Sequence, residues 1–195
     1  MRVIAGTLRS RPLAAPRGLK TRPTSDRLRE TLFNVLAPRI PGAVFADLYA
    51  GSGAVAIEAL SRGAAHIHLV ENARPAAVCI RANLAALGIT SNFTLHERSV
   101  ITTLERLAQQ GTAQALPQGT AFDLVFLDPP YEAEAEYSLT LHTLASGAAQ
   151  LLAPNAIVIA EHAARSPLAA HYGNLRCTRT LAQGDAALSF FTISQ

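Results

Sequence analysis

The stretch that decides the fold is VFADLYAGSG at residues 44–53, which joins an apolar strand to a glycine turn. Val44–Ala50 is rich in strand-forming residues, and Gly51-Ser52-Gly53 leads into an apolar helical pattern over Ala54–Ser61. Glycines allow a close ligand approach that a Cβ atom would block, and the N-terminus of a helix offers free N–H groups. This order of elements predicts an α/β protein that binds a ligand at the turn.

A second strand is predicted over Ala65–Glu71, and its final carboxylate lies 20 residues after Gly51. At that spacing an acidic residue meets ribose hydroxyls in nucleotide-binding α/β folds. Two cofactors compete, because Gly51-x-Gly53-x-x-Ala56 also satisfies the dinucleotide fingerprint. A carboxylate at Asp47 would repel a pyrophosphate, whereas S-adenosylmethionine carries an ammonium and a sulfonium and has no phosphate. The charge of Asp47 therefore favours S-adenosylmethionine.

The sequence FDLVFLDPPY at residues 122–131 predicts a buried strand that delivers Asp128 to the carboxyl edge of the sheet. Two successive prolines, Pro129 and Pro130, cannot continue a central strand and hold the local carbonyls and carboxylate as stiff acceptors. Such acceptors suit an NH2 group, and Tyr131 adds a flat face for a planar base. The stretch resembles the (D/N)-P-P-(Y/F) motif of S-adenosylmethionine-dependent amino methyltransferases. The competing interpretation is a proline-terminated strand with a solvated aspartate.

The remaining periodicities complete a sheet of seven strands. Asn72 is expected to cap a helix that ends at Gly88, and Gln183-Gly184-Asp185 is a hairpin signal. Further strands are predicted at 92–97, 156–160, 176–181 and 186–193, and further helices around 101–108 and 137–148.

Positive charge is concentrated at the start of the chain. Residues 1–40 hold nine Lys and Arg against two Asp and Glu, whereas residues 41–195 hold eight against twelve. The basic residues recur at spacings that no helix explains, which predicts a flexible basic arm that contacts nucleic acid rather than a plain solubilising segment. We therefore divide the chain into an appendage, residues 1–40, with the arm, a short strand at 2–6 and a helix capped by Thr24 or Ser25, and a main domain, residues 41–195.

Several classes are disfavoured by composition. The chain has 195 residues, and no apolar run approaches the roughly 18 residues that cross a membrane, nor does the start contain a signal-peptide core. We expect no membrane association and a cytoplasmic location. Cys79 and Cys177 are predicted to be reduced packing residues, and the six histidines form no metal-ligand spacing, so we expect no metal.

Four motifs together resemble the RsmD family of bacterial 16S rRNA guanine-N2 methyltransferases. They are RPTSDR at 22–27 with RETLFN at 29–34, DLYAGSG at 47–53, EALSRGA at 58–64, and DPPY at 128–131. The resemblance implies a class I, Rossmann-like methyltransferase sheet whose last strand is antiparallel, S-adenosylmethionine as cofactor, and one guanine of 16S rRNA, free or in an assembling or assembled small ribosomal subunit, as substrate. At the end of strand 92–97 the family places an acidic residue near adenine, for which Ser99 or Glu97 must stand in.

The expected reaction is direct, in-line methyl transfer to the guanine N2 without a covalent enzyme intermediate. An adenine-N6 or protein-glutamine methyltransferase would use the same Asp-Pro-Pro-Tyr grip. An NAD-dependent oxidoreductase would use the same glycine turn, and a non-catalytic RNA-binding assembly factor would explain the basic arm alone. The expected site residues are, for catalysis, Asp128, Pro129, Pro130 and Tyr131; for the cofactor, Asp47, Tyr49, Gly51, Ser52, Gly53, Glu71 and Ser99; and for RNA, Arg9, Arg11, Arg17, Lys20, Arg22 and Arg27.

Overall fold

The computed structural model describes residues 1–16, 26–110, 121–130 and 133–194, and the chain divides into two units, Met1–Ser99 and Val100–Gln195. This division does not coincide with the expected boundary after residue 40, which stays a prediction. Among the expected site residues, those outside the described ranges are Arg17, Lys20, Arg22 and Tyr131, as are the expected caps Thr24 and Ser25.

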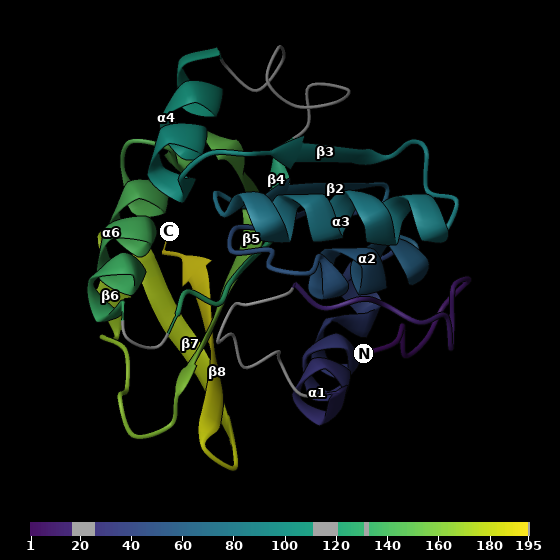
Figure 1. The fold of residues 1–195 in the computed structure, drawn as a ribbon. Helices are drawn as coiled ribbons and strands as arrows, with labels where there is room; N and C mark the ends of the chain where they lie inside the picture. The colour runs from purple at the N-terminus through teal and green to yellow at the C-terminus, as the bar shows by residue number, and fades with distance from the viewer. Residues whose placement is uncertain (17–25, 111–120, 131–132, 195) are drawn as a thin grey trace. The chain divides into compact units, whose positions relative to one another are not determined.

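The sheet of the first unit consists of three parallel strands in the order β3-β2-β1. All four residues of β1 are buried, as in a parallel sheet that is covered on both faces. Helices α2 and α3 lie side by side (Figure 1). Since the strands are parallel, Asp47 and Glu71 reach the same edge of the sheet. The elements are α1 (Asp26–Leu36), η1 (Ala37–Arg39), β1 (Val44–Asp47), α2 (Ala54–Ser61), β2 (His66–Val70), α3 (Arg74–Ala86) and β3 (Phe93–His96).

Residues 1–16, the described part of the N-terminal arm, are hydrogen-bonded to this unit, whereas a flexible segment was expected. The buried carboxylate of Glu58 in α2 accepts the backbone N–H groups of Ile4 at 2.7 Å and Ala5 at 2.9 Å. Val3 and Leu13 are buried. The expected strand over residues 2–6 is reduced to one isolated bridge between Arg2 and Pro12, because the carboxylate takes up the N–H groups that a longer ladder would need.

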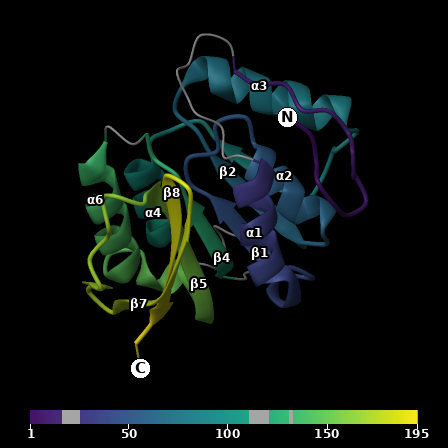
Figure 2. The same ribbon diagram turned by 90° about the horizontal axis from the view of Figure 1, so that it is seen from below.

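The second unit contains five strands in the order β4-β5-β8-β7-β6, of which β4 and β5 are parallel and the others antiparallel. Helices α4 and α6 pack against each other, and β7 and β8 form the expected hairpin (Figure 2). Strand β7 alternates in exposure except at residues 178–180, next to its register shift, which is typical of an antiparallel strand with one solvated face. The elements are α4 (Val100–Gln110), β4 (Phe122–Leu127), α6 (Glu134–Ala145), η3 (Ala149–Leu151), β5 (Leu152–Ala163), β6 (His171–Tyr172), β7 (Leu175–Gln183) and β8 (Ala186–Ile193).

Two further sequence-based expectations are wrong. The described residues contain eight strands rather than seven, because β6 has only two residues and is too short to show a periodicity. The N-cap of α3 is Ala73 rather than Asn72, and its side chain makes no capping bond. The carboxylate of Glu71 accepts the Ala73 N–H at 2.8 Å instead, so the strand-end glutamate takes the place of the expected cap. Among the described helices, none is long and apolar enough to cross a membrane.

Three histidines of β2 and β3 form a cluster whose charge state affects stability. His68 is almost fully buried, and its Nδ1 lies 3.1 Å from Nε2 of His96, while His66 packs beside it. Burial, with smaller contributions from His96 and His66, lowers the pKa of His68 from 6.5 to about 3. Between pH 6.5 and about 3, His68 is therefore protonated in the unfolded chain and neutral in the folded chain.

From this difference we predict that His68 destabilises the fold as the pH falls from 6.5 towards 3, by about 1.4 kcal/mol per pH unit. The free energy of unfolding, measured with denaturant at pH 7 and pH 5, should fall by about 2 kcal/mol less in His68→Gln than in the wild type. An equal fall in both proteins would contradict this assignment.

Candidate active site

The glycine turn of the first unit leaves room for a ligand on one side. Gly51 and Gly53 have positive φ angles of 54° and 78°, and the Gly53 N–H donates to the Ala50 carbonyl at 2.6 Å. A Cβ atom on Gly53 would approach Leu69 to 3.1 Å, so this glycine is needed for packing as well as for its backbone angle. A Cβ atom on Gly51 would meet nothing within 4 Å, so Gly51 borders open space.

Glu71 lies directly against this turn, as the spacing of 20 residues predicts. One carboxylate oxygen accepts the Gly51 N–H at 2.8 Å, and the other accepts the Ala73 N–H at 2.8 Å. The half-buried carboxylate thus joins the glycine turn to the N-terminus of α3. In nucleotide-binding α/β folds, an acidic residue at this position accepts hydrogen bonds from the ribose hydroxyls.

Asp47 is 1% exposed and lies at the N-terminus of α2. Its Oδ2 accepts the Ala56 N–H at 3.3 Å. This carboxylate therefore occupies a position where a helix N-terminus would otherwise attract an anion. The turn consequently offers negative charge to a ligand, rather than the bare N–H groups that bind phosphate.

The other residues expected at the cofactor differ in their surroundings. Tyr49 and Ser52 are half-buried next to the turn, whereas Ser99 is exposed after the end of β3. Glu97, the alternative to Ser99, forms an ion pair with Arg81.

The Asp-Pro-Pro stretch follows β4 in the second unit. Asp128 is half-buried, Pro129 is buried and Pro130 is exposed, while Tyr131 lies outside the described residues. The Leu127–Ala160 pair in the register of β4 and β5 brings Asp128 beside the carboxyl end of β5. The carboxylate thus reaches the edge that the proline pair predicts. Asp128 and the glycine turn belong to different units, so their convergence on one site stays a prediction.

Tyr137 is a residue at this edge that our sequence reasoning missed. It is 4% exposed, and its hydroxyl donates to the Glu161 carbonyl at 2.9 Å and lies 3.4 Å from the Pro129 carbonyl. The hydroxyl ties the Asp-Pro-Pro stretch to the end of β5. A tyrosine on the buried face of a predicted helix was the available signal, because a buried hydroxyl needs a partner.

The described residues of the RNA set fall into two groups. Arg9 and Arg27 are exposed and, together with Arg2, Asp26 and Glu30, line a polar pocket of about 320 Å³ in the first unit. Arg11 instead donates to the Ala86 carbonyl at the end of α3 at 3.0 Å. Arg9 and Arg27 are therefore better placed than Arg11 to meet a phosphate.

Asn83 links the arm to the glycine turn and was also missed. Its buried amide accepts the Ala14 N–H at 2.8 Å and donates to the Ala14 carbonyl at 3.1 Å and to the Ser52 carbonyl at 2.9 Å. One side chain thus fixes both the arm and the turn. Nothing in the helical pattern of α3 separates Asn83 from an ordinary polar position.

The fold and the strand-end carboxylates define a Rossmann-like α/β protein of the class I methyltransferase type. A family model described as "Conserved hypothetical protein 95" matches residues 1–192. The chain belongs to this family, which is the RsmD family that its motifs resemble.

Individual relatives agree with this assignment. The Bacillus subtilis protein YlbH is 33% identical over 192 residues, which is 98% of each chain. The Escherichia coli protein "Ribosomal RNA small subunit methyltransferase D" is 40% identical over 131 residues, which is 67% of this chain and 60% of that protein. The solved structure of the Escherichia coli protein yhhF superposes with a TM-score of 0.82 and 32% identity, covering 100% of this chain and 98% of the other.

Proposed function

We propose that this protein transfers a methyl group from S-adenosylmethionine to the exocyclic N2 amine of one guanine in 16S rRNA. The observation that carries the proposal is the glycine turn that meets two carboxylates, Glu71 at 2.8 Å from the Gly51 N and Asp47 at the N-terminus of α2. The name of the Escherichia coli relative, a small-subunit rRNA methyltransferase, supports the substrate class. The substrate would be cytoplasmic rRNA, free or within an assembling or assembled small subunit.

The residues at the glycine turn fit S-adenosylmethionine by the chemistry of their side chains. Glu71 would exchange its backbone hydrogen bonds for the ribose diol, and Asp47 would face the positive charge of the methionine end. The open space next to Gly51 leaves room for the cofactor to approach the protein backbone closely. The residues that would hold the cofactor are Asp47, Tyr49, Gly51, Ser52, Gly53, Glu71 and Ser99.

The same geometry argues against NAD. A pyrophosphate binds at free N–H groups of a helix N-terminus, whereas Asp47 already occupies the Ala56 N–H with a buried negative charge. Calorimetry with each ligand separately tests the choice. S-adenosylmethionine should bind and NAD should not, and a protein that binds only NAD would contradict the proposal.

The Asp-Pro-Pro-Tyr stretch would hold the acceptor amine. When bound, S-adenosylmethionine would supply a methyl group on a sulfonium. The N2 lone pair would form the new bond to this methyl group, the electrons of the carbon–sulfur bond would stay on the thioether sulfur, and N2 would release one proton to solvent. An aryl amine is a poor nucleophile while its lone pair is delocalised into the ring. Asp128 and the Pro129 carbonyl would accept its N–H bonds and favour the reactive geometry, Pro130 would stiffen the turn, and Tyr131 would stack on the base.

The basic residues would bind rRNA phosphates. This assignment covers Arg9, Arg11, Arg17, Lys20, Arg22 and Arg27, and Arg9 and Arg27 carry it most directly because they share one polar pocket. Deleting the whole arm would not test RNA binding alone. It would also remove Ile4 and Ala14, whose N–H groups donate to Glu58 and Asn83, and Asn83 in turn donates to Ser52 in the glycine turn. Point substitutions separate RNA binding from these contacts.

We predict that the double substitution Arg9→Ala with Arg27→Ala weakens binding to a 16S rRNA fragment and flattens its salt dependence. Each phosphate contact that is lost should reduce the slope of log K against log salt by about 0.7 to 0.9. The control is Arg106→Ala on α4, an exposed arginine outside the arm. Affinity and slope should be measured between 50 and 200 mM salt, over which a protein with six to ten phosphate contacts loses about 10³- to 10⁵-fold in affinity. If the double variant showed the wild-type slope, Arg9 and Arg27 would not bind RNA phosphates.

A further inference from the structure

A pocket of about 210 Å³ in the second unit lies between α6 and the carboxyl end of β5. We call it the α6–β5 pocket. Tyr137 lines it, and the hydroxyl of that residue lies 3.4 Å from the Pro129 carbonyl. The register of β4 and β5 brings Asp128 beside Glu161, the residue before another lining residue, His162. The pocket therefore borders the stretch that would hold the acceptor amine.

The wall formed by His162 and Tyr137 is fixed by internal hydrogen bonds. His162 is 2% exposed, and its ring nitrogens lie 3.0 Å from the Ala163 carbonyl and 2.8 Å from the Ser189 hydroxyl. Tyr137 donates to the Glu161 carbonyl. These two side chains thus present a stiff wall to a ligand, rather than mobile polar groups. Preorganised walls of this kind lower the entropy cost of binding.

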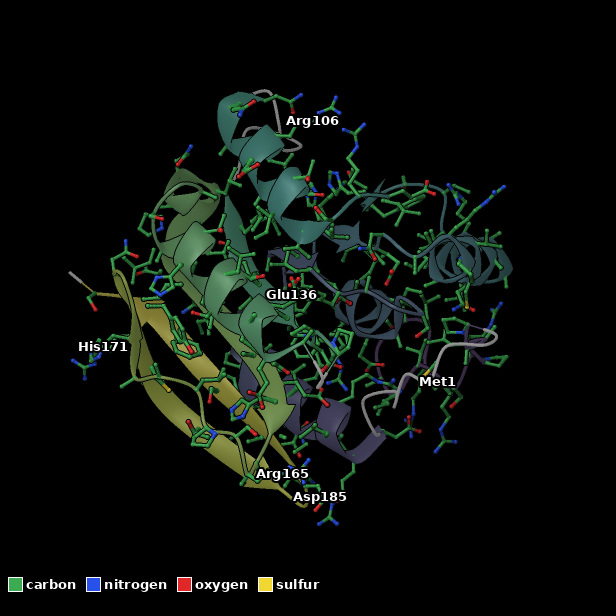
Figure 3. All side chains as sticks on the ribbon, turned by 60° about the vertical axis from the view of Figure 1, so that its left-hand side comes forward. Met1, Arg106, Glu136, Arg165, His171 and Asp185 are labelled. Atoms are coloured by element: carbon green, nitrogen blue, oxygen red, sulfur yellow. The ribbon has the colours of Figure 1, made fainter. Side chains whose placement is uncertain are left out.

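The opposite side of the pocket is apolar and lies in the segment that follows β5. Pro167 and Leu168 line the pocket there. The Ala164 N–H donates to the Asp185 carbonyl at 2.9 Å, which ties this segment to the turn between β7 and β8. Figure 3 shows Arg165 and Asp185 close together at that end of the hairpin, whereas His171 lies on β6 at the outer side of the sheet. The hairpin therefore supports the segment that closes the pocket.

The polar side chains that reach this pocket from the exposed face of α6 are Glu134 and Ser138. The volume lies below the roughly 300–1,000 Å³ of pockets for drug-sized ligands, so a single planar base suits it better than a whole cofactor. A carboxylate accepts hydrogen bonds only. Guanine presents an N1–H donor on its Watson–Crick edge, whereas adenine presents an acceptor at N1 that a carboxylate repels.

We infer that the α6–β5 pocket receives the target guanine, with Glu134 accepting its N1–H while Asp128 and the Pro129 carbonyl hold the N2 amine. This inference rests on the proposed function and adds to it the residue that selects guanine over adenine. Enzymes that act on an extruded base read its Watson–Crick edge in this way. Glu134 is thus a specificity-determining contact, and the wall around His162 and Tyr137 positions the base.

The test compares substitutions on the exposed face of α6, where they do not disturb the core. Ser138→Leu should fill the pocket and lower kcat/KM for small-subunit rRNA by about 100-fold. Glu134→Ala should lower kcat/KM by about 10- to 100-fold, and the control Glu105→Ala on α4 should not. The dissociation constant for S-adenosylmethionine, measured by calorimetry, should be unchanged in all three variants.

The outcomes separate this inference from the proposed function. A wild-type protein that methylates rRNA, together with Ser138→Leu and Glu134→Ala variants of equal kcat/KM, would overturn the inference alone. A wild-type protein that binds S-adenosylmethionine but methylates no rRNA would overturn the proposed function, and the inference with it. Loss of cofactor binding in Ser138→Leu would also overturn the inference, because the pocket would then belong to the cofactor.

Discussion

Replacing Asp128 with alanine should lower kcat for methyl transfer by about 100- to 1,000-fold, without weakening the binding of S-adenosylmethionine. Asp128 follows β4 at the carboxyl edge of the second unit, next to a buried proline whose carbonyl is held near the Tyr137 hydroxyl. Removing the carboxylate would take away an acceptor that acts on the amine when charge develops in the transition state. Single-turnover kinetics and calorimetry on the same preparation would separate the two effects.

Asp128→Asn is the matched control for this substitution. An amide keeps one acceptor oxygen in the same place, and asparagine occurs at this position in the amino methyltransferase motif that the stretch resembles. The asparagine variant should therefore retain much more activity than the alanine variant. If the alanine variant turned over at nearly the wild-type rate, Asp128 would have no role in the chemistry.

Replacing Glu71 with alanine should have its largest effect on cofactor affinity. The side chain would lose charge-assisted hydrogen bonds to the ribose, worth about 1.5 to 3 kcal/mol, which corresponds to about a 10- to 150-fold rise in the dissociation constant. The turnover of the saturated enzyme should change much less. Calorimetry for affinity and saturation kinetics for kcat measure the two quantities.

A control is needed because Glu71 also bonds the backbone of Gly51 and Ala73. The melting temperature without cofactor should therefore be measured for the wild type and the variant. If affinity were unchanged while the melting temperature fell, Glu71 would be a structural clamp between the glycine turn and α3. Affinity that falls in a variant with a near-normal melting temperature would support the ribose contact.

Much of the fold could be predicted because local pattern and tertiary environment agree. The bounds of α2, Ala54–Ser61, match the expected range, since apolar residues and flanking glycines limit this helix at both ends. The hairpin of β7 and β8 follows the Gln183-Gly184-Asp185 signal. Strand β6 gave no signal because its two residues are too few to show a periodicity.

The contacts of the arm could not be predicted from the sequence, because they join residues that are far apart in the chain. Glu58 lies more than 50 residues from the N–H groups that it accepts, and Asn83 is separated from Ala14 by 69 residues. Arg29 carries a charged side chain, yet it is fully buried in α1 and donates to the Arg2 carbonyl at 2.7 Å. A long-range polar partner leaves no periodicity, and a pattern of apolar residues cannot reveal it.

The candidate site was predicted where a residue type and a strand end coincide. Asp47, Glu71 and Asp128 all follow or end strands, and parallel strands deliver such residues to one edge within each unit. Tyr137 and Glu134 were missed as site residues because they lie on a helix after the motif. Their positions depend on how α6 packs relative to β5, and the helical pattern of the sequence does not specify this packing.

The most direct test of the central claim is to identify the methylated product. Small-subunit RNA that lacks the modification should be incubated with the protein and S-adenosylmethionine labelled in its methyl group, then digested to nucleosides and separated. The label should appear in N2-methylguanosine from 16S rRNA. Label in N6-methyladenosine, or in protein and not in RNA, would contradict the account.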